Sequence, residues 1–186
     1  AVSAVEEGRA FRMIRMSDLK PEDRTRLVEH HLVSYDLLKF SELSAALISS
    51  GETVSIMINE EDHIRIQSMQ AGLNLEAAYE AAAAAALILE GKLSLAYSER
   101  YGFLTACPTN TGTGMRASVM AHLPGLTMSG RIKDVIESLN KMGFAVRGNY
   151  GEHSKAQGHL FQISNQLTLG LTEDDLISDL KRMLLQ

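Results

Sequence analysis

The chain has 186 residues, of which 45% are hydrophobic and 22% charged, with a net charge of -5 and one cysteine. This length is enough for one domain with a buried core, so we expect a single domain over residues 1–186. The negative charge argues against a general nucleic-acid binder, and the single cysteine excludes an internal disulfide and fits a reducing, cytoplasmic compartment. The longest apolar run, residues 81–89, is too short to span a bilayer, and residues 1–8 lack the apolar core of a signal peptide. We therefore expect neither nucleic acid nor membrane as a partner.

Several short runs alternate apolar and polar residues, which is the pattern of β-strands. The strands predicted in this way cover residues 11–16, 52–59, 64–70, 101–107, 116–123, 144–147 and 159–164. Residues 34–50 have a mixed pattern, and we assign no element there. Short strands and a few helices without regular βαβ units predict an α+β fold with a mainly antiparallel sheet.

Helices are predicted at residues 21–31, 75–91, 129–141 and from residue 172 to the chain end. Pro21 suits a first helical position, Asn74 and Ser129 are expected N-caps, and Gly91 and Gly143 are expected stops. Six consecutive alanines, residues 81–86, favour a helix but are expected to place no packing side chains. Residues 148–157 are glycine-rich and polar and predict a mobile loop.

The sequence CPTNTGTGMR at residues 107–116 is the stretch around which the rest of the chain is organised. Proline, asparagine and glycines force a loop, and its backbone amides can form a concave site for an anion. Arg116 adds a permanent charge with a planar fork of donors. The alternative is a buried free cysteine before an ordinary turn.

Two further stretches carry charge. Glu60, Glu61 and Asp62 follow a predicted strand and precede His63 and Arg65. Adjacent acids at a strand end need a cation, which could be Mg²⁺, a guanidinium or both. The third stretch is RGNYGEH, residues 147–153.

These three stretches, in this order, resemble the guanidino kinases, which include creatine kinase, arginine kinase and the bacterial protein-arginine kinases. CPTN with a glycine-rich turn resembles the family signature, and NEEDHIR and RGxxGE resemble its two carboxylate-bearing loops. The resemblance covers about residues 27–180. It implies a catalytic domain with a large antiparallel sheet flanked by helices, and phosphoryl transfer from ATP with Mg²⁺.

The resemblance also implies roles for individual residues. Glu61 and Glu152 match the carboxylates that hold the guanidino group, and one of them can act as general base. Cys107 matches the thiolate beside the substrate nitrogens. The residues matched to nucleotide contacts are His31 for the base, His153 for the ribose, Arg65, Arg116 and Arg147 for the phosphates, and Asn110 for the anion-stabilising turn. Glu60 and Asp62 match acids that organise Mg²⁺ through water. For His30, His31 and His153, packing at a helix end or exposure on a loop is an equal alternative.

Two features depart from the family pattern. An upstream Ser-Thr/Ser-Arg-x-Arg segment has no match in residues 1–59, so we expect a fragment or a domain incomplete at its N-terminal side. The sequence SNQLTLG at residues 164–170 lacks the basic residues of phosphagen kinases. With Gly112 and Gly114, it resembles the bacterial protein-arginine kinases.

The sequence therefore predicts an ATP-dependent protein-arginine kinase. Its partners would be protein substrates that carry arginine, and an activator, the protein-degradation machinery and a second copy of the chain are further candidates. One alternative is a phosphagen kinase that acts on a free guanidino compound. Another is an inactive module that binds nucleotide or phosphoarginine, although Glu61, Cys107 and Glu152 together argue against it.

Overall fold

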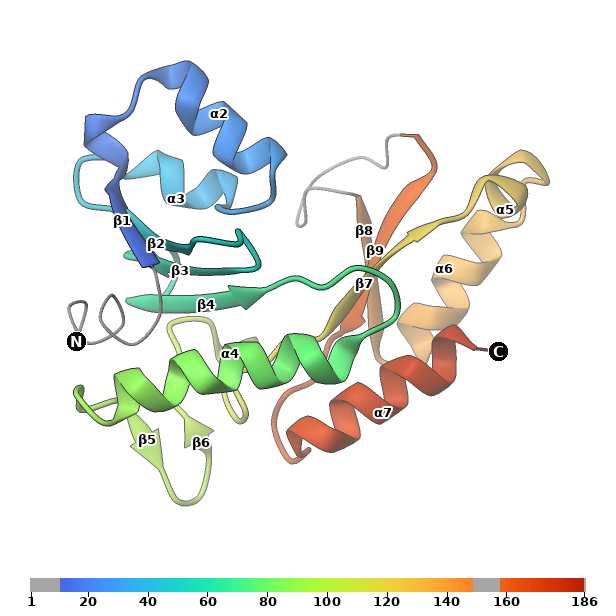
Figure 1. Ribbon diagram of the computed structural model, residues 1–186. Helices are drawn as coiled ribbons and strands as arrows, with labels where there is room; N and C mark the ends of the chain where they lie inside the picture. Colours follow the sequence, from blue (N-terminus) through green and yellow to red (C-terminus); the bar gives the residue numbers. More distant parts are fainter. Residues whose placement is uncertain (1–10, 149–157, 186) are drawn as a thin grey trace. The chain divides into compact units, whose positions relative to one another are not determined.

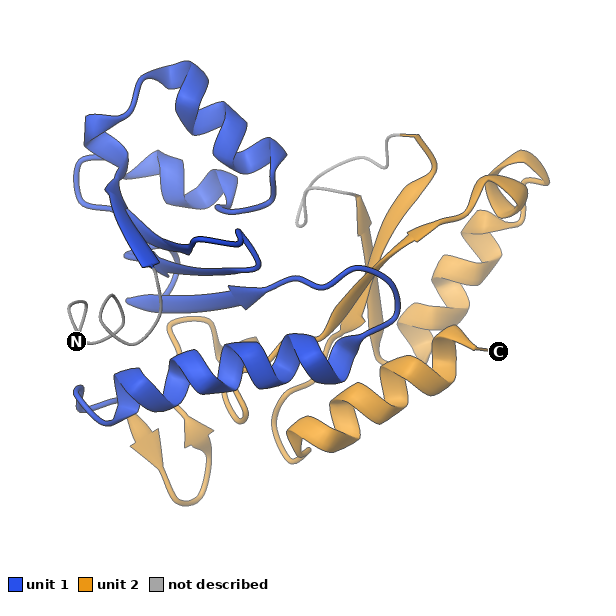
Figure 2. Cartoon of the chain, in the orientation of Figure 1, with its two compact units in different colours: residues 1–95 blue, residues 96–186 orange. Residues whose placement is uncertain are grey.

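The computed structural model describes residues 11–148 and 158–185. The chain divides into two compact units, residues 1–95 and 96–186, which Figure 2 shows in blue and orange. The expectation of one catalytic domain over the whole chain stays a prediction.

The first unit is built on a four-stranded antiparallel sheet in the order β1-β2-β3-β4. Its strands are β1 (Phe11–Arg15), β2 (Ala45–Ser49), β3 (Val54–Ile58) and β4 (Ile64–Ser68). Strand β2 lies in the region where the sequence supported no assignment. Ile58 pairs with Ile64, so the acidic stretch forms the turn between β3 and β4.

Helices cover both faces of this sheet. Figure 1 shows α4 (Leu75–Glu90) along one face, and α2 (Pro21–Glu29) and α3 (Tyr35–Lys39) on the other. A short 3-10 helix, η1 (Met16–Asp18), follows β1. Val54 and Ile56 face the α4 side, whereas Met57 alternates to the opposite face and is also fully buried. Burial on both faces fixes the register of β3 and with it the position of the turn that follows.

The alanine run belongs to the core of this unit, which corrects the expectation that it places no packing side chains. Ala85 is fully buried in a cluster with Leu47, Ile56 and Leu89, and Ala81 packs against the same cluster. Residues four apart share one helix face, so small side chains bring α4 close to the sheet. Asn74 precedes α4 but makes no side-chain cap bond.

The second unit contains a three-stranded antiparallel sheet and a short hairpin. The sheet has the order β7-β9-β8, with β7 (Ser118–His122), β8 (Phe144–Gly148) and β9 (Leu160–Asn165). The hairpin is β5 (Tyr97–Ser98) with β6 (Gly102–Phe103), and η2 (Pro108–Asn110) follows it. Helix α6 (Ile132–Lys141) packs on β8, and α7 (Glu173–Leu184) packs on β9.

Two predictions in the second unit were wrong in detail. The strand expected at residues 101–107 is only Gly102–Phe103, because the residues after it enter the turn of η2. Ser129 does not cap α6, which starts after Arg131. Pro124 instead starts an unpredicted short helix, α5 (Pro124–Met128), and Ser129 lies at its C-terminal end.

The predicted fold class is confirmed, because every described strand pair is antiparallel and helices flank the sheets. The described strands are divided among three sheets rather than joined in one large sheet. None of the helices in residues 11–148 and 158–185 has the length and apolar character needed to cross a membrane.

Candidate active site

A tight turn between β3 and β4 carries the predicted carboxylates. Asn59 adopts a left-handed conformation, with φ of 58°, and its N–H donates to the carbonyl of His63 at 3.0 Å. Its side-chain amide donates to the carbonyl of Leu43 at 2.8 Å, and the Glu60 N–H donates to the Asp62 carbonyl at 3.2 Å. Asparagine is among the few residues that tolerate this conformation. The turn is therefore held by its own backbone and by a neighbouring loop.

The Glu60 side chain points into the protein and is only 3% exposed. Its Oε1 accepts hydrogen bonds from the Ser34 hydroxyl at 2.6 Å and from the Arg65 guanidinium at 2.7 Å. Its Oε2 accepts the backbone N–H of Glu61 at 2.8 Å. The Ser34 hydroxyl also accepts the N–H of Leu37 at 3.1 Å and so caps α3. The Oε1 atom of Glu60 thus ties the turn to the start of α3 and holds Arg65, while Oε2 closes the turn itself.

Glu61 and Asp62 differ from Glu60 in exposure. Glu61 is exposed and Asp62 is half-buried. Within residues 11–148 and 158–185, no three histidine, cysteine or acidic side chains are placed to hold a metal ion directly. Mg²⁺ keeps several water ligands when it binds proteins, so a contact through water fits such a turn. To contact metal-bound water, the Glu60 carboxylate would have to accept a further hydrogen bond in addition to its three existing ones. That role stays a prediction.

His31 follows α2 in the same unit and has a left-handed backbone, with φ of 56°. Its carbonyl accepts a hydrogen bond from the side-chain amide of Gln67 on β4. Burial lowers the pKa of the His31 imidazole below 6.5, which favours the neutral ring at pH 7. His30 differs, because its ring lies 3.6 Å from the Glu52 carboxylate. A neutral, half-buried ring can stack on a nucleotide base, as predicted for His31.

The second unit carries Cys107, which is half-buried and immediately precedes η2. The Thr105 hydroxyl donates to the Cys107 carbonyl at 2.7 Å. The Thr109 hydroxyl lies 3.0 Å from the Cys107 sulfur and also accepts a hydrogen bond from the Arg116 guanidinium at 3.1 Å. Because arginine only donates, the hydroxyl proton of Thr109 is available to the sulfur. The loop thus places a hydrogen-bond donor at the sulfur.

Arg116 is fixed against the same loop, which we call the Cys107 loop (residues 107–116). Its Nε donates to the Asn110 side-chain carbonyl at 2.9 Å, and a terminal nitrogen lies 3.5 Å from the Asn165 carbonyl. The structure thus brings together Asn110 and Arg116, just as it brings together Glu60 and Arg65 in the first unit. A guanidinium held in this way is a preorganised positive charge.

The third predicted stretch is only partly described. Arg147 lies on β8, is half-buried and pairs in register with Gln162 of β9. Glu152 and His153 lie outside the described residues, as does the predicted loop after Gly148 up to residue 157. Their expected roles stay predictions.

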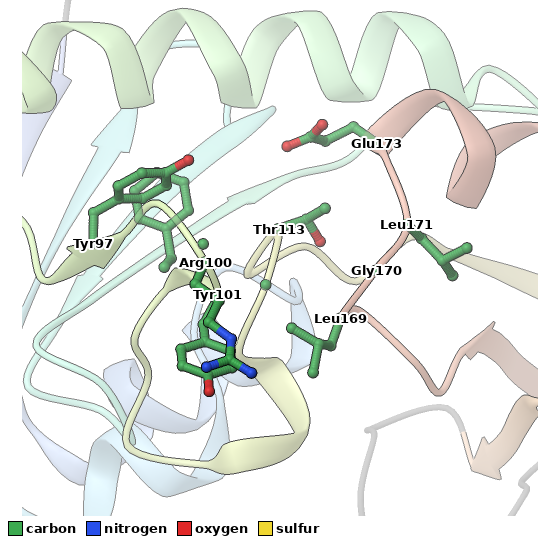
Figure 3. A pocket seen from close by; sticks show the side chains of 11 residues that line it. Tyr97, Arg100, Tyr101, Thr113, Leu169, Gly170, Leu171 and Glu173 are labelled. Atoms are coloured by element: carbon green, nitrogen blue, oxygen red, sulfur yellow. The ribbon is translucent and has the colours of Figure 1, made fainter.

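An open cavity of about 260 Å³ lies in the second unit, beside the Cys107 loop. Figure 3 shows its lining, which comes from the β5-β6 hairpin, from residues around Thr113 and from the start of α7. The guanidinium of Arg100 lies over the ring of Tyr101, 5.0 Å from its centroid. Neither Cys107 nor Arg116 lines the cavity. The cavity is lined by Gly112 and Thr113 of the Cys107 loop but not by the loop residues to which the chemistry is assigned.

The sequence analysis did not identify three residues that hold the turn between β3 and β4 or the Cys107 loop, namely Ser34, Asn165 and Thr168. Ser34 had a local signal, because serine is a preferred N-cap, but α3 itself was not predicted. Thr168 bonds to the carbonyls of Thr109 and Thr111, more than 50 residues away in the chain. No local pattern could have revealed such contacts.

Comparison with known families shows to which protein family the chain belongs. The model of the family described as "ATP:guanido phosphotransferase, C-terminal catalytic domain" matches residues 1–186. The chain belongs to this family. The resemblance drawn from the three motifs is therefore confirmed.

Relatives of this phosphotransferase domain include two bacterial proteins named protein-arginine kinase. The one from Geobacillus thermodenitrificans is 51% identical over 176 residues, which cover 95% of this chain and 48% of the relative. The one from Shouchella clausii is 51% identical over 174 residues, which cover 94% of this chain and 49% of the relative. The chain thus spans about half the length of the curated relatives it matches.

Solved structures agree with this assignment. The duplicated taurocyamine kinase from Schistosoma mansoni, with bound transition state analog components, has a TM-score of 0.80 and 30% identity. The match covers 94% of this chain and 26% of that one. A lombricine kinase has a TM-score of 0.76 and 26% identity, covering 98% of this chain and 56% of that one.

Proposed function

We propose that the protein is an ATP-dependent protein-arginine kinase, which transfers the γ-phosphate of Mg-ATP to arginine guanidino groups of other proteins. The observation that carries the proposal is the 51% identity to bacterial proteins named protein-arginine kinase. The residues of the turn and of the Cys107 loop are suited to this chemistry.

The substrate guanidinium is a poor nucleophile, because it is protonated near neutral pH. Glu61 is exposed at the end of a rigid hairpin and can accept two of its N–H donors in a fork geometry. Glu152 would be the second carboxylate that holds the substrate. One of these carboxylates takes a proton from the attacking nitrogen as the N–P bond forms. The bond from the γ-phosphorus to the bridging oxygen breaks, and ADP leaves with the electron pair.

Cys107 would lie beside the substrate nitrogens as a thiolate. The Thr109 hydroxyl lies 3.0 Å from the sulfur and can donate a hydrogen bond to it. A negative sulfur attracts the positive guanidinium and helps to orient the nitrogen that attacks. We assign the thiolate this orienting role and leave proton removal to the carboxylates.

Three arginines would neutralise the transferring phosphoryl group, whose charge is spread over its oxygens in the transition state. Arg65 is fixed by Glu60 and Arg116 by Asn110, so neither needs to be ordered during the reaction. Arg147 would be the third. Asn110 and the amides of its loop would support the same anion.

The remaining predicted residues would bind the nucleotide and its metal. Bound Mg²⁺ supplies positive charge to the β- and γ-phosphates. Asp62 and Glu60 would contact its water ligands. His31 would stack on the base as a neutral ring, and His153 would reach the ribose.

The proposed partners follow from the substrate. Proteins that carry accessible arginine side chains would be substrates. An activator protein, the protein-degradation machinery and a second copy of the chain are proposed as further partners, and the cytoplasm is proposed as the location.

A phosphagen kinase is the second candidate. The likeness to a taurocyamine kinase and a lombricine kinase favours it, at 30% and 26% identity. The lower identity to these proteins, compared with the 51% to protein-arginine kinases, places it second.

The test is to incubate the protein with Mg-ATP labelled at the γ-phosphate and with either casein or free arginine. Acid-labile label on casein alone supports the proposal. Label on free arginine supports the phosphagen kinase. Label on neither supports an inactive module that binds nucleotide or phosphoarginine. The variant Glu61→Gln is the control for contaminating kinases, because its exposed side chain can change without disturbing the fold.

A further inference from the structure

The segment after β9, residues 165–168, makes long-range contacts with the Cys107 loop that the proposed chemistry does not use. Asn165 and Thr168 are both buried, with exposed fractions of 4% and 2%. Most polar side chains buried to this extent have hydrogen-bond partners. Both find them in the loop or directly beside it.

Thr168 holds the backbone on both sides of Asn110. Its hydroxyl lies 2.9 Å from the carbonyl of Thr109 and 2.8 Å from the carbonyl of Thr111, and its one proton is shared between them. Its own carbonyl accepts the N–H of Thr113 at 3.4 Å. Thr109 is the residue whose hydroxyl contacts the Cys107 sulfur. Thr168 therefore holds the backbone that carries this hydroxyl.

Asn165 holds the chain on both sides of Arg116. Its side-chain carbonyl accepts the N–H of Ala117 at 2.7 Å, and its amide donates to the carbonyl of Met115 at 3.3 Å. The same amide donates to the carbonyl of Leu167 at 2.9 Å, so its hydrogen-bonding capacity is well used. Its backbone carbonyl also faces the Arg116 guanidinium.

The two segments also fit closely at Gly112. A Cβ atom there would lie 2.5 Å from the Thr168 carbonyl oxygen, and the glycine has φ of 120°. Only glycine allows this approach without a shift of one backbone. The Cys107 loop thus packs closely against residues 168–169 and is also hydrogen-bonded to Thr168.

We propose that Asn165 and Thr168 are positioning residues that set the reactivity of Cys107 and the orientation of Arg116. Both side chains are buried, and they act through the backbone of the Cys107 loop. The proposal rests on the proposed function only in placing Cys107 in the active site.

The test measures the rate at which iodoacetamide alkylates Cys107 at one fixed pH, followed by mass spectrometry of the peptide that contains it. Thr168→Val removes the hydroxyl with little change of shape, and Thr168→Ser keeps it. Ser164→Ala is the matched control, because Ser164 is also 2% exposed but its hydroxyl has no hydrogen-bond partner. Thermal melting confirms that each variant is folded, and Thr168→Ala replaces Thr168→Val if the latter does not fold.

Loss of the Thr168 hydroxyl should slow alkylation by about tenfold, the effect of one hydrogen bond, because fewer molecules keep the Thr109 hydroxyl at the sulfur. Thr168→Ser and Ser164→Ala should react like the wild type. A rate in Thr168→Val that equals that of Ser164→Ala, or exceeds it, would overturn the proposal. This readout needs no kinase activity, so slow alkylation in a protein that phosphorylates nothing would refute the proposed function and leave the positioning role standing.

Discussion

Glu60 and Arg65 form an ion pair at 2.7 Å in which the acid is buried and the base is not: their side chains are 3% and 48% exposed. A fully exposed ion pair contributes little to stability, but a buried carboxylate with three hydrogen bonds holds its partner in one place. The pair spans the turn that carries Glu61. Glu60 thus supports both Glu61 and Arg65.

Ser34→Ala should weaken the hold of Glu60 on Arg65. It removes the cap of α3 and one bond to Glu60, so the free energy of unfolding should fall by about 1–2 kcal/mol. KM for ATP should rise, because Arg65 is less well held. Ser55→Ala is the control, since that buried hydroxyl has no hydrogen-bond partner. Urea unfolding and steady-state kinetics would measure both effects, and equal behaviour of the two variants would contradict the role of Ser34.

Glu61→Gln should abolish transfer and leave ATP binding nearly unchanged. The amide keeps the shape but can neither remove a proton nor balance the charge of the substrate, so kcat should fall by at least about a hundredfold. Glu152→Gln should behave in the same way. Calorimetric titration with nucleotide and a transfer assay separate the two effects. Activity like that of the wild type in either variant would refute the two-carboxylate mechanism.

Cys107→Ala should reduce the rate of transfer, but less than either glutamate variant. The thiolate orients the substrate, whereas the carboxylates also take the proton. Comparison of kcat among the three variants in one assay tests this order. An unchanged kcat would mean that the thiol only packs.

Gly112→Ala should displace the Cys107 loop. The new methyl group would meet the Thr168 carbonyl, and the backbone conformation, with φ of 120°, disfavours alanine. We expect the free energy of unfolding to fall by about 2 kcal/mol. Gly125→Ala is the control, because a Cβ there meets nothing within 4 Å. Chemical denaturation of the two variants makes the comparison, and similar stabilities would show that the loop accommodates the methyl group.

His31 should make stability depend on pH. Its pKa is lowered below 6.5 by burial, so the unfolded chain binds the proton more readily than the folded one. Stability is therefore retained above pH 6.5 and is lost as the pH falls from there through the pKa of the folded state. His31→Asn, which suits the left-handed backbone, should flatten this part of the profile. The test measures the unfolding midpoint of the wild type and of His31→Asn between about pH 5 and pH 8, the range over which histidine titrates. The same dependence of the midpoint on pH in both proteins would contradict this prediction.

Local patterns predicted much of the fold. Alternation located β3 and β4, and Pro21 marked the start of α2. The helix at residues 75–91 was found, but the contribution of Ala85 to the core was not, because the value of a small side chain depends on how closely the sheet approaches. Strand β2 was missed because β2 and α3 share a short stretch of mixed pattern.

The residues of the candidate site were predicted from motifs, but the residues that hold them in place were not. Residues such as Glu61, Cys107 and Arg116 stand in recognisable spacings. Ser34 and Thr168 act through contacts between segments distant in the chain, which only the folded structure brings together. Glu60 shows the same limit, because its sequence neighbours suggest a contact with metal-bound water but do not reveal that its buried carboxylate also holds Arg65.

The most direct test of the central claim is the phosphorus NMR spectrum of casein after incubation with the protein and Mg-ATP. The account predicts a phosphoramidate signal that disappears on mild acid treatment and is absent when Glu61→Gln replaces the wild type. No phosphoramidate signal with the wild type, or a phosphoramidate signal of equal size with Glu61→Gln, would contradict it.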